Sequence, residues 1–222
     1  DTLLITATGV RKRSLAPENL VEVGLDGRPR RGGRASSELG MHLAVYRLRP
    51  DVEAIVHAHP PTAVGFASAG LGLTECLMPE VAVNLGAVPL TPYATPGTPD
   101  LETAIRDAAR EHDAFLLANH GAVTTGRSVD EALDRMETLE HFARISLVTR
   151  LLGGPQPMTA EAVGALQQLL SGQGVERAIT CTPAPGVAPL PPSPPATDPG
   201  DLAALIAEAV RTALRERGPA SG

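Results

Sequence analysis

The sequence predicts a mixed α/β domain over residues 1–181. Three observations support this fold class. Short apolar or β-branched runs bounded by Gly, Pro or Asp recur along this region, as is typical of strands. Segments with helical periodicity alternate with those runs. Apolar residues make up 43% of the chain, so helices and strands can form layers around a buried core.

Four runs are predicted as strands, at residues 3–6, 54–59, 87–90 and 114–118. The first predicted helix starts near Ser36 and Ser37 and stops before Pro50. A second helix opens at Thr98 and Pro99, because proline suits the first helical position.

Two further helices complete the predicted domain. Ser128 is followed three residues later by Glu131, which is the capping-box pattern of a helix start. Apolar residues then recur at helical spacing through Leu139. The last helix of the domain is predicted over residues 159–170.

The composition changes beyond residue 181. Residues 182–200 are dominated by proline, which cannot pair within a central strand, so they predict an extended linker spanning on the order of 60 Å. Residues 201–217 predict a short amphipathic helix capped by Asp198. Its apolar positions form one stripe: Leu202, Leu205, Ile206, Ala209, Val210 and Ala213. So short a helix is marginal alone, and we expect it to dock on a partner or on its own domain or oligomer.

Composition excludes several functional classes. A net charge of -6 and a scarcity of aromatic residues argue against nucleic acid as the partner. No apolar run reaches the roughly 18 residues that a membrane span needs. No basic region followed by an apolar stretch opens the chain, so a cytoplasmic location is expected. Cys76 and Cys181 are far apart and match no metal motif, and they are expected to be reduced thiols.

His57 and His59 give the strongest local signal for chemistry. Side chains two apart on a strand point to the same face, so the two imidazoles can converge on one metal ion. Pro60 and Pro61 end the strand at once, which places the pair at the strand mouth. On pattern alone, the alternative that both histidines are incidental stays open.

A metal centre requires a third ligand, for which the sequence offers four candidates: His42, His112, His120 and His141. His141 lies in the helix predicted from Ser128, among apolar neighbours. A helical histidine in that setting is more often a core residue than a ligand, so the pattern alone does not select it.

Glu38 follows Ser36 and Ser37 at a predicted helix start. Two hydroxyls and free backbone N–H groups at a helix N-terminus suit an anion such as phosphate. Simple helix capping is the alternative. An anion site beside a carboxylate and a histidine-rich metal site suits chemistry on a phosphorylated carbonyl compound.

Five segments together resemble the class II aldolase/adducin family, in particular its fuculose-phosphate aldolase branch. They lie at residues 5–10, 33–38, 54–59, 92–97 and 118–121, in the family's order and spacing. The resemblance covers residues 1 to about 152. It implies a three-layer α/β/α domain with a mainly antiparallel central sheet, assembled as a homotetramer with active sites between subunits.

The resemblance also implies a zinc site. His57, His59 and His141 match the three zinc-binding histidines, and three protein nitrogens with an open position form a catalytic zinc site. Glu38 matches the carboxylate that transfers protons. His120 lies in the family's Asn-His-Gly turn and is expected to support the site structurally rather than to bind zinc.

The remaining implied site residues contact the substrate. Thr8, Gly9, Ser36 and Ser37 match the phosphate pocket. Tyr93 matches a tyrosine that reaches the active site of a neighbouring subunit. The implied reaction is reversible cleavage of a ketose 1-phosphate, such as L-fuculose 1-phosphate, to dihydroxyacetone phosphate and an aldehyde such as L-lactaldehyde.

Several alternatives stay open within this resemblance. A pentulose-phosphate 4-epimerase, a decarboxylase or a dehydratase would use the same zinc histidines with different acid and base groups. A non-catalytic interaction domain, as in the adducin branch, is a further alternative. The chain holds one lysine, Lys12, which disfavours a lysine Schiff-base route.

Two features depart from the family pattern. Family members carry a helix and a Gly-Asn-x-Ser loop before the strand that begins here at Leu3, and that loop supplies part of the phosphate pocket. We therefore expect either missing upstream residues or an altered phosphate site. The proline-rich linker and the helix over 201–217 resemble peptides that direct enzymes into bacterial microcompartments, which suggests a shell protein as partner.

Overall fold

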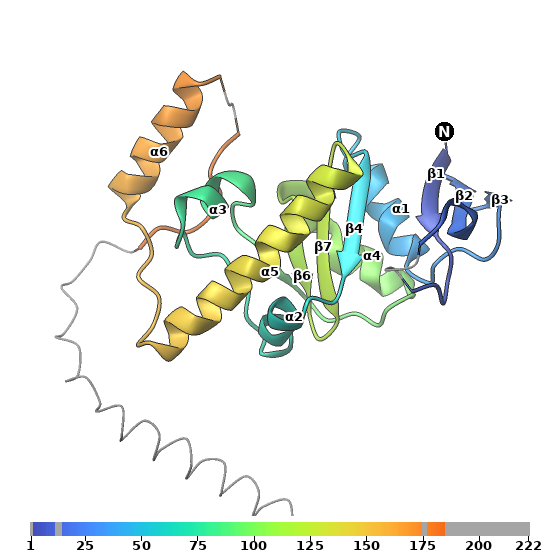
Figure 1. The fold of residues 1–222 in the computed structure, drawn as a ribbon, viewed down its shortest axis with the longest axis horizontal. Helices are drawn as coiled ribbons and strands as arrows, with labels where there is room; N and C mark the ends of the chain where they lie inside the picture. The colour runs from blue at the N-terminus through green and yellow to red at the C-terminus, as the bar shows by residue number, and fades with distance from the viewer. Residues whose placement is uncertain (1, 12–14, 175–176, 185–222) are drawn as a thin grey trace, which may run out of the picture. The chain divides into compact units, whose positions relative to one another are not determined.

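The computed structural model describes residues 2–11, 15–174 and 177–184, which belong to a compact unit spanning Asp1–Gly186 (Figure 1). Its elements, in chain order, are β1 (Thr2–Thr6), η2 (Pro17–Asn19), β2 (Leu20–Gly24), β3 (Pro29–Arg31), α1 (Leu39–Leu48), β4 (Ala54–Ala58), α2 (Pro61–Ser68), α3 (Pro79–Asn84), β5 (Leu90–Thr91), α4 (Pro99–Glu111), β6 (Ala114–Leu117), β7 (Gly121–Gly126), α5 (Val129–Leu151) and α6 (Ala160–Gly172).

The central sheet has the strand order β4-β7-β6-β5. The β4–β7 and β7–β6 pairs are antiparallel, whereas β5 and β6 are parallel. The sheet is therefore mixed, and the expectation of a mainly antiparallel sheet holds only for β4, β7 and β6. The cause is the connection from β5 to β6 through helix α4, because a parallel pair requires a crossover of this kind.

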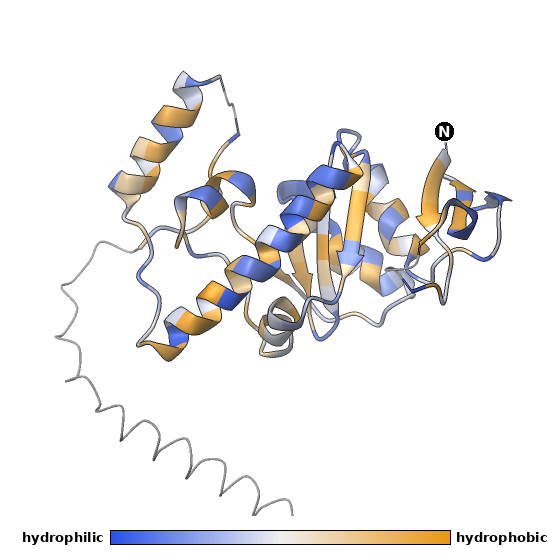
Figure 2. Cartoon of the chain, in the orientation of Figure 1, coloured by the Kyte–Doolittle hydropathy of each residue, from blue (hydrophilic) through white to orange (hydrophobic). Residues whose placement is uncertain are grey.

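Helices cover both faces of this sheet, which confirms the predicted three-layer α/β/α architecture (Figure 1). Ala114 and Leu116 of β6 pack with α2, α3 and α5. The alternate residues Phe115 and Leu117 pack with α1 and α4 on the opposite face. All four side chains are apolar and buried, so β6 contributes to the core on both sides of the sheet. The central strands are coloured largely as hydrophobic (Figure 2).

A second, three-stranded antiparallel sheet of order β1-β2-β3 precedes the central one. Its small core is formed by Ile5, Val21 and Val23. An isolated antiparallel bridge between Ala7 and Ala35 joins the end of β1 to the segment that leads into α1.

Helices α4, α5 and α6 begin where the sequence predicts, directly after Thr98, Ser128 and Thr159, whereas α2 and α3 were not predicted. Helix α4 begins at Pro99 after Thr98. The first helix begins at Leu39 rather than at Ser36 or Ser37. Of the predicted strands, the one placed at 87–90 is shorter and later than expected, since β5 covers Leu90–Thr91.

The predicted cap of α5 forms with one change. The Ser128 hydroxyl accepts a hydrogen bond from the N–H of Glu131 at 3.1 Å. In a full capping box the Glu131 side chain would accept a hydrogen bond from the Ser128 N–H. Here it accepts one from the Arg127 N–H instead, at 2.7 Å.

Cys76 and Cys181 form a disulfide bond with their Cα atoms 5.1 Å apart, so the prediction of two free thiols was wrong. Residues 177–184 run beside the segment that holds Cys76. The Thr182 N–H donates to the carbonyl of Thr74 at 2.7 Å, and the Cys76 N–H donates to the carbonyl of Thr182 at 3.0 Å. This pairing brings together two cysteines that are 105 residues apart in sequence.

The predicted linker over 182–200 lies almost wholly outside the described residues, and the predicted helix over 201–217 lies wholly outside them. Within the described part of the chain, no helix is both long and apolar enough to cross a membrane.

Candidate metal centre

His57 lies near the end of β4, and His59 is the first residue after Ala58, the last residue of that strand. Pro60 then adopts an extended conformation and α2 begins at Pro61. The two histidines therefore lie at the mouth of a strand, as the sequence predicts. His57 is buried and His59 is exposed.

The hydrogen bond of His57 determines which of its nitrogens can bind a ligand. Its Nδ1 atom lies 3.0 Å from the carbonyl oxygen of Ala122 on β7. A carbonyl only accepts hydrogen bonds, so this contact requires a proton on Nδ1. The neutral ring then carries its lone pair on Nε2, which is the form that a metal-binding histidine needs.

His120 is brought to the pair by the connection between β6 and β7. This connection pairs Leu117 with Gly121 across three intervening residues. Asn119 takes a left-handed conformation there, with a φ of 57°, which asparagine tolerates better than most residues. The His120 Nδ1 atom is buried without a hydrogen-bond partner among the described residues.

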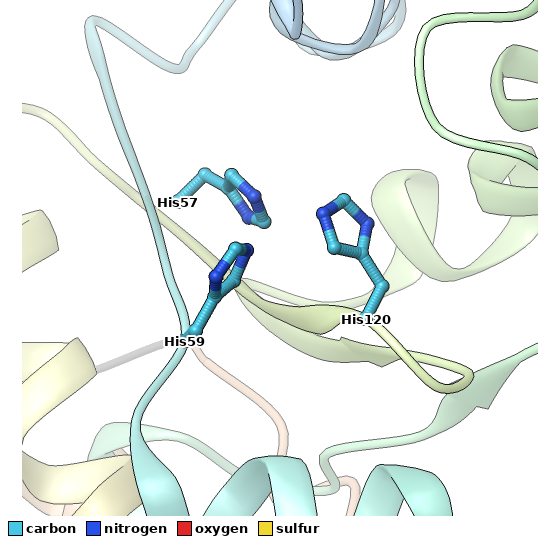
Figure 3. A group of neighbouring side chains, drawn as sticks. All are labelled: His57, His59 and His120. Carbon is cyan, nitrogen blue, oxygen red and sulfur yellow. The ribbon is translucent and has the colours of Figure 1, made fainter. Parts of the chain in front are cut away.

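The imidazoles of His57, His59 and His120 point toward one another and form a nearly equilateral triangle (Figure 3). Their ring centroids are 4.9 to 5.0 Å apart. One ligand nitrogen from each ring lies within 4.8 Å of the others. Tetrahedral zinc with nitrogen ligands at about 2.0 Å requires nitrogens about 3.3 Å apart. The rings, whose ligand nitrogens lie within 4.8 Å of one another, must therefore move closer together to hold the ion.

Gly121 allows this close approach. A Cβ atom at this position would lie 2.6 Å from Cδ2 of His59 and 2.9 Å from Cε1 of His57. The same Cβ would lie 2.8 Å from the carbonyl oxygen of Ala58. These distances are too short for any side chain, so the cluster requires glycine here. The Asn-His-Gly turn was the sequence signal for this contact, although it did not identify His120 as part of the cluster.

His120 thus lies in the candidate metal centre, whereas the sequence led us to expect a supporting role nearby. His141 lies on α5 with an exposed side chain, outside the group formed by the other three. However, the preceding residue, Glu140, forms hydrogen bonds to Thr62, three residues after His59. The turn of α5 that carries His141 is therefore attached next to the histidine pair, and its role as the third ligand stays a prediction.

Glu38 occupies the N-cap position of α1, where its side chain forms no capping hydrogen bond and is partly buried. Its Oε2 atom has no hydrogen-bond partner among the described residues, although it is buried. The Ser36 hydroxyl accepts a hydrogen bond from the Glu38 N–H at 3.2 Å. A buried carboxylate oxygen without a partner is unfavourable unless a ligand or proton satisfies it, so this atom is suited to bind one.

The four residues predicted to bind phosphate lie on two neighbouring segments. Thr8 and Gly9 follow β1, and Ser36 and Ser37 precede α1. The Thr8 N–H donates to the carbonyl of Arg34 at 3.0 Å, which holds the segments side by side. Gly9 has a φ of 76° and is exposed, which leaves this edge of the site open.

Tyr93 is 63% exposed and lies in the loop after β5. It lines a cavity of about 580 Å³ between this loop and α4. None of the three clustered histidines lines this cavity. Its predicted contact with a neighbouring subunit stays a prediction.

An ion-pair network that sequence reasoning missed lies at the opposite end of β6. Asp113, the residue before this strand, contacts Arg49 at 2.8 Å, Arg177 at 3.0 Å and Arg135 at 3.3 Å. Burial raises the pKa of Asp113, but the hydrogen bond from Arg49 and the charges of Arg177 and Arg135 outweigh it, so the pKa is lowered overall. His112 lies at this end too, which separates it from the histidine cluster.

Comparison with known proteins supports a common ancestry with sugar-phosphate lyases. The family model described as Class II Aldolase and Adducin N-terminal domain matches residues 1–147. The 3-oxo-tetronate 4-phosphate decarboxylase of Escherichia coli K12 is 35% identical over 173 residues, which cover 76% of this chain and 80% of the relative. The 5-deoxy-D-ribulose 1-phosphate aldolase of Bacillus thuringiensis is 34% identical over 173 residues, 77% of this chain and 80% of the relative.

Solved structures agree with these relatives. That of an L-fuculose 1-phosphate aldolase matches with a TM-score of 0.70 and 28% identity, covering 77% of this chain and 80% of the other. The residues that the family model matches, 1–147, include the strands and turns that assemble the histidine cluster. By sequence and by fold, the chain therefore belongs to the class II aldolase and adducin family.

Proposed function

We propose that this chain is a zinc-dependent lyase that cleaves a carbon–carbon bond in a phosphorylated sugar or sugar acid and leaves the enediolate of dihydroxyacetone phosphate. The observation that carries this proposal is the triangle of His57, His59 and His120 in a chain of this family. Three imidazoles supply nitrogen ligands that suit zinc, and the cluster lies at an open strand mouth.

The enediolate is the feature shared by the reactions of the relatives. Retro-aldol cleavage of a ketose 1-phosphate between C3 and C4 releases an aldehyde and leaves the bonding electrons on C3, next to the carbonyl. Loss of carbon dioxide from 3-oxo-tetronate 4-phosphate leaves the electrons on C2, again next to the carbonyl. Protonation of either carbanion gives dihydroxyacetone phosphate, so one site can serve both reactions.

The residues that would hold the metal are His57 and His59, with His120 or His141 as the third nitrogen ligand. When bound, zinc supplies Lewis-acid stabilisation of the negative charge on the enediolate oxygens. The hydrogen bond from His57 Nδ1 to Ala122 keeps the ligating nitrogen unprotonated.

The other residues supply proton transfer and binding. Glu38 gives the enediolate carbon its proton and removes that proton in the reverse direction, which suits a carboxylate with a buried, unpartnered oxygen. Ser36 and Ser37 would bind the phosphate with Thr8 and Gly9, through hydroxyl and backbone N–H groups. The phosphate would then hold the reacting carbon in one position relative to Glu38.

Retro-aldol cleavage is the first candidate reaction, with L-fuculose 1-phosphate as a representative substrate. It requires a base to remove the C4 hydroxyl proton, and Tyr93 of a neighbouring subunit is the proposed partner on the aldehyde side. Its 63% exposure leaves the side chain available for such a contact within a homotetramer.

Decarboxylation is the second candidate, favoured by 35% identity to a 3-oxo-tetronate 4-phosphate decarboxylase. This reaction requires no hydroxyl proton to be removed, so Tyr93 would be dispensable for it. Replacement of Tyr93 by Phe therefore separates the candidates: it slows cleavage of a ketose 1-phosphate and leaves decarboxylation nearly unchanged.

The test is release of dihydroxyacetone phosphate by the zinc-loaded protein from L-fuculose 1-phosphate and from 3-oxo-tetronate 4-phosphate, followed with a coupled dehydrogenase. The expected result is release from at least one substrate, lost on chelation, restored by zinc and absent in His57→Ala. Release that persists in a chelator would refute the metal-dependent mechanism. No release from either substrate by a zinc-loaded protein would refute the proposed substrate class.

A further inference from the structure

Helix α2 follows the histidine pair directly and has no cap of its own. Its first turn contains Thr62 and Ala63, whose N–H groups have no partner within the helix. The residue at the cap position is Pro60, which offers no side-chain hydrogen bond. The N–H groups therefore need an acceptor from elsewhere in the chain.

Glu140 of α5 supplies this acceptor from 78 residues downstream. Its carboxylate accepts hydrogen bonds from the Thr62 N–H at 3.0 and 3.1 Å and from the Ala63 N–H at 3.0 Å. It also accepts the Thr62 hydroxyl hydrogen at 2.7 Å. A carboxylate at this position is further favoured by the positive end of the helix dipole.

The position of Glu140 on α5 is itself fixed by packing. Its neighbours Leu139 and Phe142 are buried in the same core cluster as Ala63. The Glu140 side chain is only 19% exposed. Its contact with Arg144 is long, at 3.9 Å, and that arginine is 72% exposed, so this ion pair contributes little. The carboxylate therefore acts chiefly on α2.

The two segments that Glu140 joins are those that carry candidate metal ligands. Thr62 lies three residues after His59, and Glu140 immediately precedes His141. The intervening Pro60 and Pro61 restrict the backbone between His59 and Thr62. A shift of the α2 N-terminus would therefore be transmitted to His59.

We infer that Glu140 is a positioning residue for the metal centre. Its hydrogen bonds to the first turn of α2 hold the junction between β4 and α2, which carries His57 and His59, against helix α5, which carries His141. This inference rests on the proposed metal-dependent function, and it assigns a role to a residue that does not contact the metal or substrate. The carboxylate also occupies the N-terminus of α2, so the substrate phosphate must bind elsewhere, consistent with the segments at Thr8 and Ser36.

The test compares metal binding by the full chain in three forms: wild type, Glu140→Gln and Glu137→Gln. Glu137 lies on the same helix with an exposed side chain, so its variant controls for loss of charge on α5. Titration with Co²⁺, followed by its visible absorption, reports both affinity and ligand geometry. Removal of a group that hydrogen-bonds a metal ligand typically weakens metal affinity about 10- to 100-fold. Glu140 acts through Thr62 and Ala63, so for Glu140→Gln only we expect a loss near the lower end, about 10-fold, with altered absorption bands.

A second variant keeps the inference testable if Glu140→Gln does not fold. Thr62→Ala removes the 2.7 Å hydroxyl bond from the α2 side and leaves α5 unchanged. It should weaken Co²⁺ binding in the same direction, whereas Thr62→Ser should restore it. Unchanged affinity and absorption bands in both Glu140→Gln and Thr62→Ala would overturn the positioning role while leaving the metal centre intact. Failure of the wild-type protein to bind Co²⁺ or Zn²⁺ would overturn the metal centre itself.

Discussion

Replacement of Gly121 by alanine is the most direct perturbation of the histidine cluster. The backbone at Gly121 does not have a positive φ, so alanine is not excluded by conformation. The effect must therefore come from the added methyl group. That methyl group would lie 2.6 Å from Cδ2 of His59 and 2.9 Å from Cε1 of His57.

The size of the effect follows from these distances. Carbon atoms in ordinary contact lie about 3.5 Å or more apart, so the two rings must retreat by about 0.9 and 0.6 Å. Metal–ligand distances tolerate only about 0.2 Å of variation, and displaced ligands lose affinity. We expect zinc affinity to fall at least 10-fold, with a loss of about 1–3 kcal/mol in the free energy of unfolding from overpacking.

The assay is isothermal titration of the metal-free protein with Zn²⁺, paired with chemical unfolding of the metal-free form. Gly164→Ala is the matched control, because Gly164 lies in α6 and a Cβ there meets no atom within 4 Å. This variant should bind zinc normally and be about 0.5–1 kcal/mol more stable, since alanine favours a helix. Unchanged zinc affinity in Gly121→Ala would refute the placement of the metal between these rings.

Three further predictions concern other parts of the chain. Cys181→Ser should lower the free energy of unfolding by up to about 5 kcal/mol, because the disulfide closes a loop of 105 residues. The measurement is denaturant titration under oxidising conditions, and equal stability of variant and wild type would contradict the prediction. Asp113→Asn should cost about 1–3 kcal/mol near neutral pH, because three guanidinium groups each lose one charged partner. Folding lowers the pKa of Asp113 below its unfolded value of about 3.9, so the Asp113 carboxylate stabilises the fold fully at pH values above the unfolded pKa. That stabilisation is lost as the pH falls through the lower pKa of the folded state. The unfolding curves of variant and wild type should therefore converge only in acid. Glu38→Gln should slow the release of dihydroxyacetone phosphate by about 10²- to 10⁴-fold while the protein still folds, as judged by circular dichroism, and a smaller loss would exclude Glu38 as the main proton-transfer group.

Local signals made part of this fold predictable. Thr98 and Pro99 mark a helix start because proline has no N–H to leave unpaired and its φ is already helical. His57 and His59 share one side of a strand end because the residue repeat of a strand is two. Such rules depend only on neighbours in sequence, and the structure follows them at these positions.

Contacts between distant segments were not predictable in this way. Strand β7 was not predicted, although the β-branched residues Val123, Thr124 and Thr125 between two glycines are a usable strand signal. Without β7, local sequence patterns do not bring His120 next to β4, and only the resemblance to the family placed it near the site. The disulfide between Cys76 and Cys181 and the capping of α2 by Glu140 likewise depend on tertiary packing across 105 and 78 residues.

The most direct test of the proposed function is hydrogen exchange on dihydroxyacetone phosphate itself, followed by proton NMR in deuterated water. Both candidate reactions pass through the same enediolate, so the test does not depend on which substrate the chain prefers. The zinc-loaded protein is predicted to exchange one of the two hydrogens on the hydroxymethyl carbon stereospecifically, and a chelator is predicted to stop the exchange. Exchange no faster than in the chelated sample, from protein shown to hold zinc, would contradict an enediolate-forming site in this chain.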